Sequence, residues 1–171
     1  MTPAPRLGRF SWCLYDWANS AFPTVITTFV FSAYFTSTIA ADKISGTAQW
    51  GIAISLSGLF VALLSPFLGA IADHGGRRKP WIFVFTVLCA VATALLWQAK
   101  PDVSFVLLAL VLVAVGNFAF EMAMVFYNAM LPDLTSADRI GRVSGWGWGL
   151  GYAGGLACLG FALVALVQAE T

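Results

Sequence analysis

Two carboxylates stand inside otherwise apolar stretches of the chain, where an ionisable side chain is costly and usually faces a cavity or a partner. By helical spacing, Asp16 shares a face with Asn19 and Ser20, and Glu121 follows Asn117 by one turn. We interpret Asp16, Asn19, Asn117 and Glu121 as candidates for a substrate or proton pathway. In the alternative interpretation, Asp16 lies at the level of the lipid headgroups and Glu121 merely pairs with an arginine from a loop, since both are only about 9 Å inside the expected spans.

The composition places these carboxylates in a membrane protein. The chain has 171 residues, of which 60% are hydrophobic and 10% are charged, and its formal net charge is +1. A soluble domain is usually about half apolar and about a quarter charged. These values exclude an ordinary soluble globule, a disordered tail and a basic nucleic-acid-binding domain, and they make the lipid bilayer the expected partner.

Five apolar segments have the length of membrane helices, which predicts an all-α polytopic membrane protein. The connections between them are short, and no linker divides residues 1–171 into soluble domains. The expected spans are 10–39, 50–72, 81–98, 103–127 and 143–167.

The fifth segment carries glycines at four-residue intervals, Gly147, Gly151 and Gly155, which form one small-residue row on a helix. Such rows let two membrane helices approach closely, so we expect a helix-packing role rather than direct contact with a substrate. In the first segment, Pro23 is expected to kink the helix, because proline donates no backbone hydrogen bond.

The loop between the second and third segments has the spacing G-x-x-x-D-x-x-G-R-[RK], formed by Gly69, Asp73, Gly76, Arg77 and Arg78. Its glycines permit a sharp turn, and its cations fix the orientation of the loop in the membrane. The alternative is a basic loop that only sets orientation, but orientation alone requires neither the aspartate nor the glycines.

This loop resembles the loop motif of the major facilitator superfamily. Residues 15–22, 127–133 and 139–152 further resemble the vacuole-effluxer-like family within that superfamily. The resemblance covers essentially the whole chain and implies the first five helices of a six-helix N-terminal bundle, with the sixth span and the second half of the transporter absent. It also implies that the first and fourth spans line a central cavity and that the 69–79 segment is a cytoplasmic gate.

The resemblance implies secondary active transport of a small solute by alternating access, as part of a larger transporter. Fungal members are associated with release of amino acids from vacuoles, so efflux, an amino acid as solute and a proton as coupling ion are expectations. The alternative is an inactive fragment, or a five-span membrane interaction module that needs a separate second half.

The sequence gives no indication of an enzyme. His74 is the sole histidine, the cysteines Cys13, Cys89 and Cys158 are far apart in apolar stretches, and no GxxxxGK[ST] phosphate loop is present. We therefore expect no metal site and no cofactor.

Lysine and arginine counts predict the orientation. Seven of these cations lie on the side of the N-terminus and two on the other, so the N-terminus is expected in the cytoplasm. Short loops and the absence of a targeting presequence favour a bacterial inner membrane.

A reporter active only in the cytoplasm tests this topology when it is fused after Arg78 or at Thr171. We expect activity at Arg78 and silence at Thr171. The reverse pattern would contradict the predicted orientation.

Overall fold

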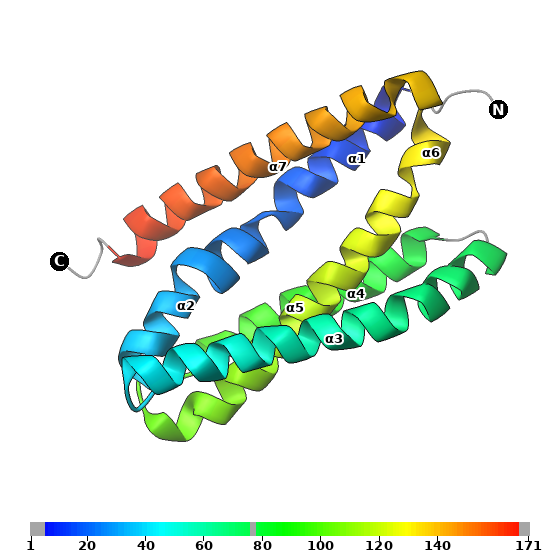
Figure 1. Cartoon of the computed structure of the whole chain (residues 1–171). Coiled ribbons are helices and arrows are strands. Elements are labelled where there is room, and N and C mark those ends of the chain that lie inside the picture. The colour runs from blue at the N-terminus through cyan, green and yellow to red at the C-terminus, as the bar shows by residue number, and fades with distance from the viewer. Residues whose placement is uncertain (1–5, 76–77, 168–171) are drawn as a thin grey trace. The chain divides into compact units, whose positions relative to one another are not determined.

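The computed structural model describes residues 6–75 and 78–167, which form helices and connecting turns with no strand among them (Figure 1). Five of the described helical stretches are long and apolar enough to cross a membrane. They are Arg6–Ile39, Lys43–Ala72, Arg78–Gln98, Val103–Leu134 and Ala137–Ala165. The prediction of an all-α polytopic fold with five spans is thus confirmed.

Each span is longer than the apolar segment that predicted it. The second span begins at Lys43 and the third at Arg78, both of which the apolar pattern had left in loops. Backbone hydrogen bonding continues a helix past its apolar residues, and the long side chains of lysine and arginine reach polar surroundings from a helix end.

The chain divides into two compact units, and each is described by itself. Unit 1 comprises Met1–Val25 and Tyr127–Thr171, and unit 2 comprises Ile26–Phe126.

The first span changes its helical form after Asn19. It begins as α1 (Arg6–Asn19), continues as the π-helix η1 (Phe22–Phe29), and ends with α2 (Phe31–Tyr34) and a second π-helical stretch, η2 (Phe35–Ile39). Pro23 explains the break, because it has no amide hydrogen and its ring would collide with the carbonyl of Asn19 in an α-helix.

Hydroxyl side chains in this span donate hydrogen bonds back to the preceding turn. Thr24 Oγ1 donates to the Ser20 carbonyl at 2.8 Å, and Ser32 Oγ donates to the Thr28 carbonyl at 2.7 Å. Thr36 Oγ1 donates to the Ser32 carbonyl at 3.0 Å. Each bond satisfies a hydroxyl inside an apolar environment without a partner from another helix.

Unit 2 contains three further spans. They are built from α3 (Lys43–Gly75), from α4 (Arg78–Leu95) with the 3₁₀ turn η3 (Leu96–Gln98), and from the 3₁₀ turn η4 (Val103–Phe105) with α5 (Val106–Ala129). At one end, Phe35, Ile39, Ala99 and Ala109 form a buried cluster. Between α4 and α5, the rings of Phe85 and Phe126 stack at a centroid distance of 5.9 Å.

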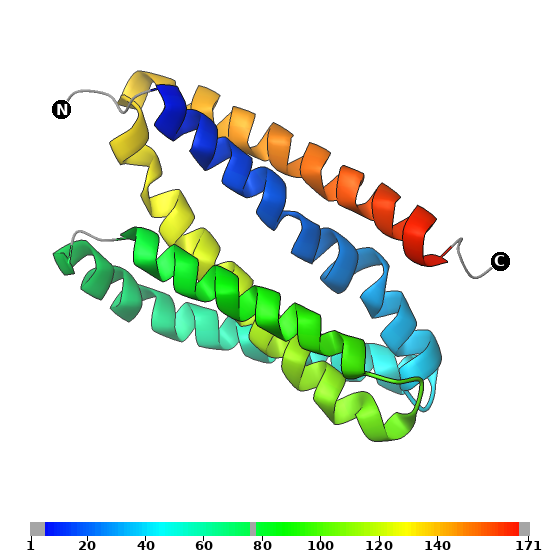
Figure 2. The same ribbon diagram turned by 180° about the vertical axis from the view of Figure 1, so that it is seen from behind.

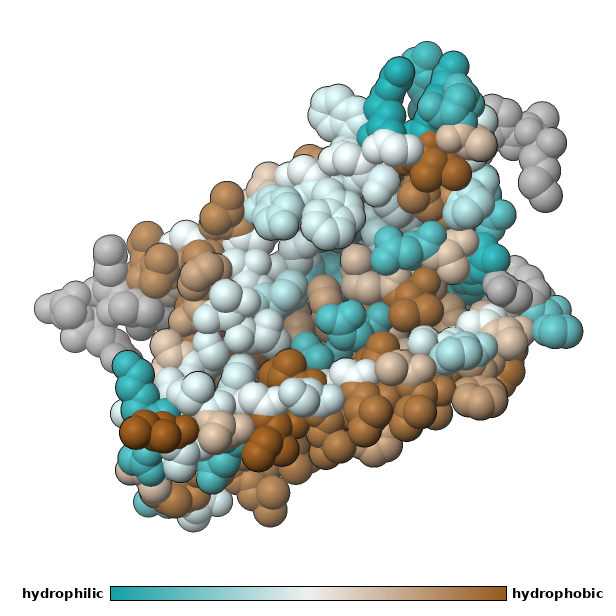
Figure 3. Space-filling view, viewed as in Figure 1, coloured by the Kyte–Doolittle hydropathy of each residue, from teal (hydrophilic) through white to brown (hydrophobic). Residues whose placement is uncertain are grey.

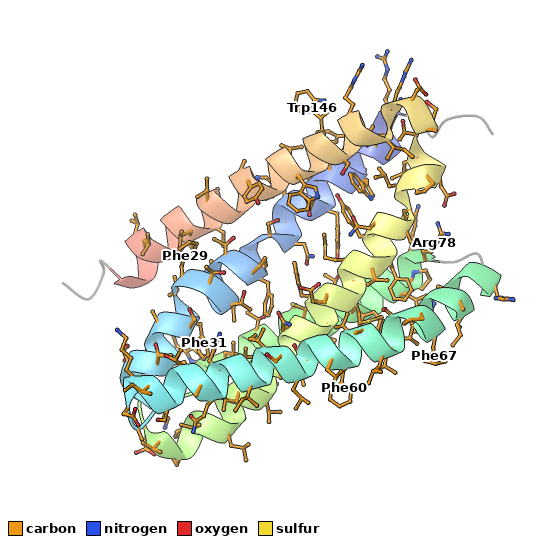
Figure 4. All side chains as sticks on the ribbon, in the orientation of Figure 1. Phe29, Phe31, Phe60, Phe67, Arg78 and Trp146 are labelled. Carbon is orange, nitrogen blue, oxygen red and sulfur yellow. The ribbon has the colours of Figure 1, made fainter. Side chains whose placement is uncertain are left out.

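Helix α3 presents a continuous apolar surface. Its large side chains are exposed along most of its length, including Phe60 and Phe67. These two point away from the helix in Figure 4, and the surface over α3 is coloured as hydrophobic in Figure 3. Such a surface is suited to hydrocarbon rather than to water.

Unit 1 pairs α1 with α7 (Ile140–Ala162), which continues into the π-helical η6 (Leu163–Val167). The end of α5 leads to α7 through α6 (Leu131–Leu134) and the 3₁₀ turn η5 (Ala137–Arg139). Helices α1 and α7 lie side by side and run in the same direction (Figure 1 and Figure 2).

The start of α3 is held by an aspartate. The backbone amides of Ile44 and Ser45 donate to Asp42 Oδ1 at 2.9 Å, and Ser45 Oγ donates to Asp42 Oδ2 at 2.6 Å. These bonds, led by the Ser45 hydroxyl, hold the pKa of Asp42 below its ordinary value of 3.8. Asp42 is therefore the N-cap of α3 and also favours the start of the helix through its charge.

Asp42→Ala should loosen the first turn of α3, because two amides and one hydroxyl lose their acceptor. We expect faster amide hydrogen exchange at Ile44 and Ser45 in detergent micelles at neutral pH. Since the folded-state pKa is lowered, the stabilisation by Asp42 is present above the unfolded-state pKa and is lost as pH falls through the folded-state pKa. Lys43→Ala, which removes a neighbouring side chain outside this set of bonds, is the control. Equal exchange rates in the two variants would contradict the capping role.

Candidate functional site

The carboxylate of Asp16 is buried in unit 1, with 7% of the residue exposed. It lies against the backbone of α7 at Gly151. A Cβ atom added to Gly151 would lie 2.6 Å from Asp16 Oδ2 and 2.9 Å from Ser20 Oγ. The carboxylate of Asp16 and the hydroxyl of Ser20, four residues apart in the first span, thus converge on the same point of α7.

An aromatic group lies one turn before Asp16. The Trp12 indole stacks on Tyr127 at a centroid distance of 4.1 Å and an interplanar angle of 6°. Trp12 Nε1 also donates to the Tyr127 carbonyl at 3.0 Å, and Tyr15 lies 5.4 Å from the Tyr127 ring. Tyr127 Oη is buried and has no hydrogen-bond partner among the described residues.

Sequence reasoning did not select Trp12 or Tyr127 as site residues. The sequence indicates Tyr127 only through its place in the segment 127–133, whereas in the structure its ring stacks on Trp12, which is distant along the chain. The signal that could have indicated Trp12 is its position one turn before Asp16, on the face that carries the carboxylate.

The glycines of α7 mark the line along which α1 approaches. A Cβ on Gly147 would lie 2.6 Å from the Trp12 ring, and one on Gly155 would lie 2.5 Å from Thr24 Oγ1. A Cβ on Gly154, which the predicted row did not include, would collide with the backbone carbonyl of Trp17. Later glycines of α7 meet later residues of the first span, so the pairing of α1 and α7 has one register.

The second candidate residue on the first span, Asn19, lies next to the break in the helix. Asn19 is the last residue of α1 and is partly exposed. Asp16, in contrast, lies about 15 Å from the start of the span at Arg6, because the helix begins earlier than the apolar pattern predicted.

In unit 2, Asn117 on α5 joins α3 through a side-chain hydrogen bond. Asn117 Nδ2 donates to Ser57 Oγ at 2.7 Å, and the Ser57 hydroxyl donates in turn to the Ile54 carbonyl at 2.9 Å. Ser57 is buried, with 3% exposed. Next to it, an open apolar hollow of about 360 Å³ lies between α3 and α5, with Phe60 and Phe118 in its wall.

Glu121 follows Asn117 by one turn of α5 and is exposed. It lies about 12 Å before the end of α5 at Ala129, inside the span Val103–Leu134. It makes no ion pair or hydrogen bond with a described residue. An exposed carboxylate at this depth is costly against hydrocarbon, so this face of α5 favours water or protein as its neighbour.

The loop motif is described in part. Gly69 and Asp73 belong to the last turns of α3, and Arg78 begins α4. Gly76 and Arg77 lie outside the described residues. A Cβ on Gly69 would meet no atom within 4 Å, so this glycine keeps an open surface on α3.

Among the described residues, no group of three His, Cys, Asp or Glu side chains is placed to hold a metal ion. What the described parts do offer is two carboxylates deep within membrane spans, Asp16 buried against α7 and Glu121 exposed on α5.

Comparison with known proteins gives a consistent family. The family model described as "Vacuole effluxer Atg22 like" matches residues 37–171. An uncharacterized MFS-type transporter, YxiO, from Bacillus subtilis (strain 168) is 40% identical over 166 residues, which are 94% of this chain and 38% of the relative. No solved structure matches the chain.

Two further relatives are more distant. An uncharacterized protein of Aquifex aeolicus (strain VF5) is 25% identical over 168 residues, 98% of this chain and 41% of the relative. Autophagy-related protein 22 of Coccidioides immitis (strain RS) is 34% identical over 84 residues, 49% of this chain and 14% of the relative. The chain therefore spans about two fifths of the length of the two relatives that it matches over nearly all its length.

Gly154→Ala should destabilise the pairing of α1 with α7 by about 2 kcal/mol, because the added methyl group meets backbone atoms of Trp17 that cannot rotate away. Gly149→Ala is the matched control, since its Cβ would meet nothing within 4 Å. The measurement is the thermal unfolding midpoint of both variants in the same detergent. Equal midpoints would contradict a close approach at Gly154.

Proposed function

The chain belongs to the vacuole effluxer Atg22-like family, and on this premise we propose that it forms the N-terminal part of a secondary active transporter. The family includes membrane transport proteins, and five apolar spans are consistent with such a protein. The finer proposal is that a small solute crosses by alternating access, in which two helical bundles rock around a site near the middle of the membrane. A second bundle would come from the additional length that the relatives have. The proposal involves no enzymatic step and no cofactor.

The observation that carries the proposal is that two carboxylates, Asp16 and Glu121, lie deep within the spans. Ionisable groups at such depth mark solute or proton pathways. Neither Asp16 nor Glu121 makes an ion pair with a described residue, so no salt bridge within the described chain accounts for them. We assign both to the solute or proton pathway.

The surroundings of the two carboxylates suggest different roles. Asp16 is buried and lies with Ser20 against α7 at Gly151, one turn after Trp12, which stacks on Tyr127. Glu121 is exposed on α5, where a solute or water could reach it. We therefore propose Glu121 as the residue that contacts solute or exchanges a proton, and Asp16 as a buried group whose surroundings are set by α7. Asn117 and Asn19 would contribute amide groups to the pathway.

The segment Gly69–Lys79 is proposed as the cytoplasmic gate. Asp73 lies in the last turn of α3 and Arg78 begins α4, so the motif occupies the connection between two spans. The cation counts support a cytoplasmic position for this connection. Its charges would act on the balance between two states of the transporter rather than on the stability of the fold, because exposed ion pairs contribute little.

The name of the family model and of the fungal relative suggests the direction and the kind of solute. We propose efflux of a small solute, with amino acids as the first class to test and a proton as the coupling ion. The bacterial relatives are consistent with a bacterial inner membrane, with the N-terminus in the cytoplasm.

Glu121→Gln should abolish proton-coupled solute flux while leaving the fold intact, since glutamine has nearly the same volume but cannot release a proton. The measurement is flux of amino acids across proteoliposomes that contain the full-length protein, with and without a pH gradient. Asp138→Asn is the control, because its side chain is 71% exposed and lies outside the proposed pathway.

Wild-type flux with an unchanged pH profile in the Glu121→Gln protein would remove Glu121 from the pathway. Absence of flux in the wild-type protein for every solute tested would instead favour the alternative of a membrane interaction module.

A further inference from the structure

A surface groove in unit 1 combines apolar walls with one cation. Phe10 and Cys13 of α1 and Val143, Trp146 and Leu150 of α7 line it, and Arg9 lies at the end where both helices begin. The groove encloses about 210 Å³ and is open along one side. It lies beside the seam that buries Asp16, because Arg9 and Cys13 share one side of α1 with Asp16 by helical spacing.

The positions of the lining residues give the groove a direction. Cys13 follows Arg9 by one helical turn, and Leu150 follows Val143 by two. The apolar walls therefore extend about 6 to 10 Å from the guanidinium toward the interior of the span. Arg9 makes no ion pair with a described residue, so its charge is available to a ligand.

The exposed side chains at the groove are suited to lipid rather than to water. Phe10 is 60% exposed and Trp146 is 67% exposed, and Trp146 projects outward from α7 in Figure 4. Tryptophan prefers the membrane interface, where its ring contacts acyl chains and its N–H contacts polar groups. Cys13 is buried and forms part of the floor.

We propose that this groove binds an anionic glycerophospholipid, with one acyl chain against Phe10, Trp146 and Leu150 and the phosphate at Arg9. The groove is complementary to a phospholipid along the axis of the span, because the Arg9 cation lies at the end of the span and the apolar walls lie deeper. A phospholipid has the same order of groups, with its phosphate at the interface and its chains below. Basic pockets between membrane helices bind anionic headgroups in this way. The cation counts assign this end of the unit to the cytoplasmic leaflet, which carries anionic lipids.

The test uses vesicles of equal parts phosphatidylglycerol and phosphatidylcholine, with bromine atoms on the acyl chains of one lipid or of the other. The bulk charge is the same in both preparations, so the difference in tryptophan quenching reports which lipid lies next to the protein. Subtracting the signal of Trp146→Phe isolates Trp146. We expect about fivefold preference for the brominated phosphatidylglycerol at Trp146, as one cation near an anionic lipid should give.

Arg9→Gln should abolish this preference, and Arg9→Lys should retain it because the charge is kept. Lys100→Gln, which removes one cation from an exposed turn elsewhere in the chain, should also retain it. Circular dichroism of each variant verifies its helix content, and the quenching assay itself requires no transport activity.

Three results would overturn the proposal. Equal quenching by both lipids in the wild type would mean that the groove holds bulk lipid without selection. Equal loss in Arg9→Gln and Lys100→Gln would indicate general surface electrostatics. Protection of Trp146 from both brominated lipids would mean that a protein segment, either of a second copy or of a transporter's other bundle, covers the groove.

Discussion

The close approach of α1 to α7 is the constraint on which unit 1 depends. At Gly154 the backbone of Trp17 occupies the space that any side chain would need, so the two helices pack backbone to backbone. In a bilayer no hydrophobic effect drives helices together, and such packing contributes much of the association. Because the glycine contacts fix one register, they also decide that Asp16 meets Gly151 and that Trp12 meets Gly147.

This register brings two features of α1 next to each other on one side of the helix. Trp12 and Asp16 meet the glycines of α7, and Arg9 and Cys13, at adjacent positions on the same side of α1, line the surface groove. A buried carboxylate and the surface groove thus lie next to each other along α1. A change in how α1 packs on α7 would therefore alter both the surroundings of Asp16 and the shape of the groove.

The sequence predicted the spans well, because a membrane helix is recognised by the length of its apolar stretch, and this length can be counted directly from the sequence. It predicted their ends less well, since the helices continue through polar residues such as Lys43 and Arg78. The break at Pro23 was predictable from the missing amide hydrogen.

Contacts between segments that are far apart in the chain could not be predicted from a single sequence. Helical spacing linked Asn117 with Glu121, but the Asn117 amide donates to Ser57 on another helix. Asp16 and the glycine row were each noticed, yet nothing in local periodicity gives the register that brings them together. Tyr127 was missed as a site residue for the same reason, because its ring acquires its environment only through Trp12.

The hydroxyls of the first span have a consequence for its solvation. The hydroxyl groups of Thr24, Ser32 and Thr36 each donate their hydrogen to a backbone carbonyl of the preceding turn. Their oxygens still carry lone pairs, so this stretch can accept hydrogen bonds but has no free hydroxyl donor at these three positions. At these three positions water, an ammonium group or a hydrated cation finds an acceptor, whereas a carboxylate finds no hydroxyl donor.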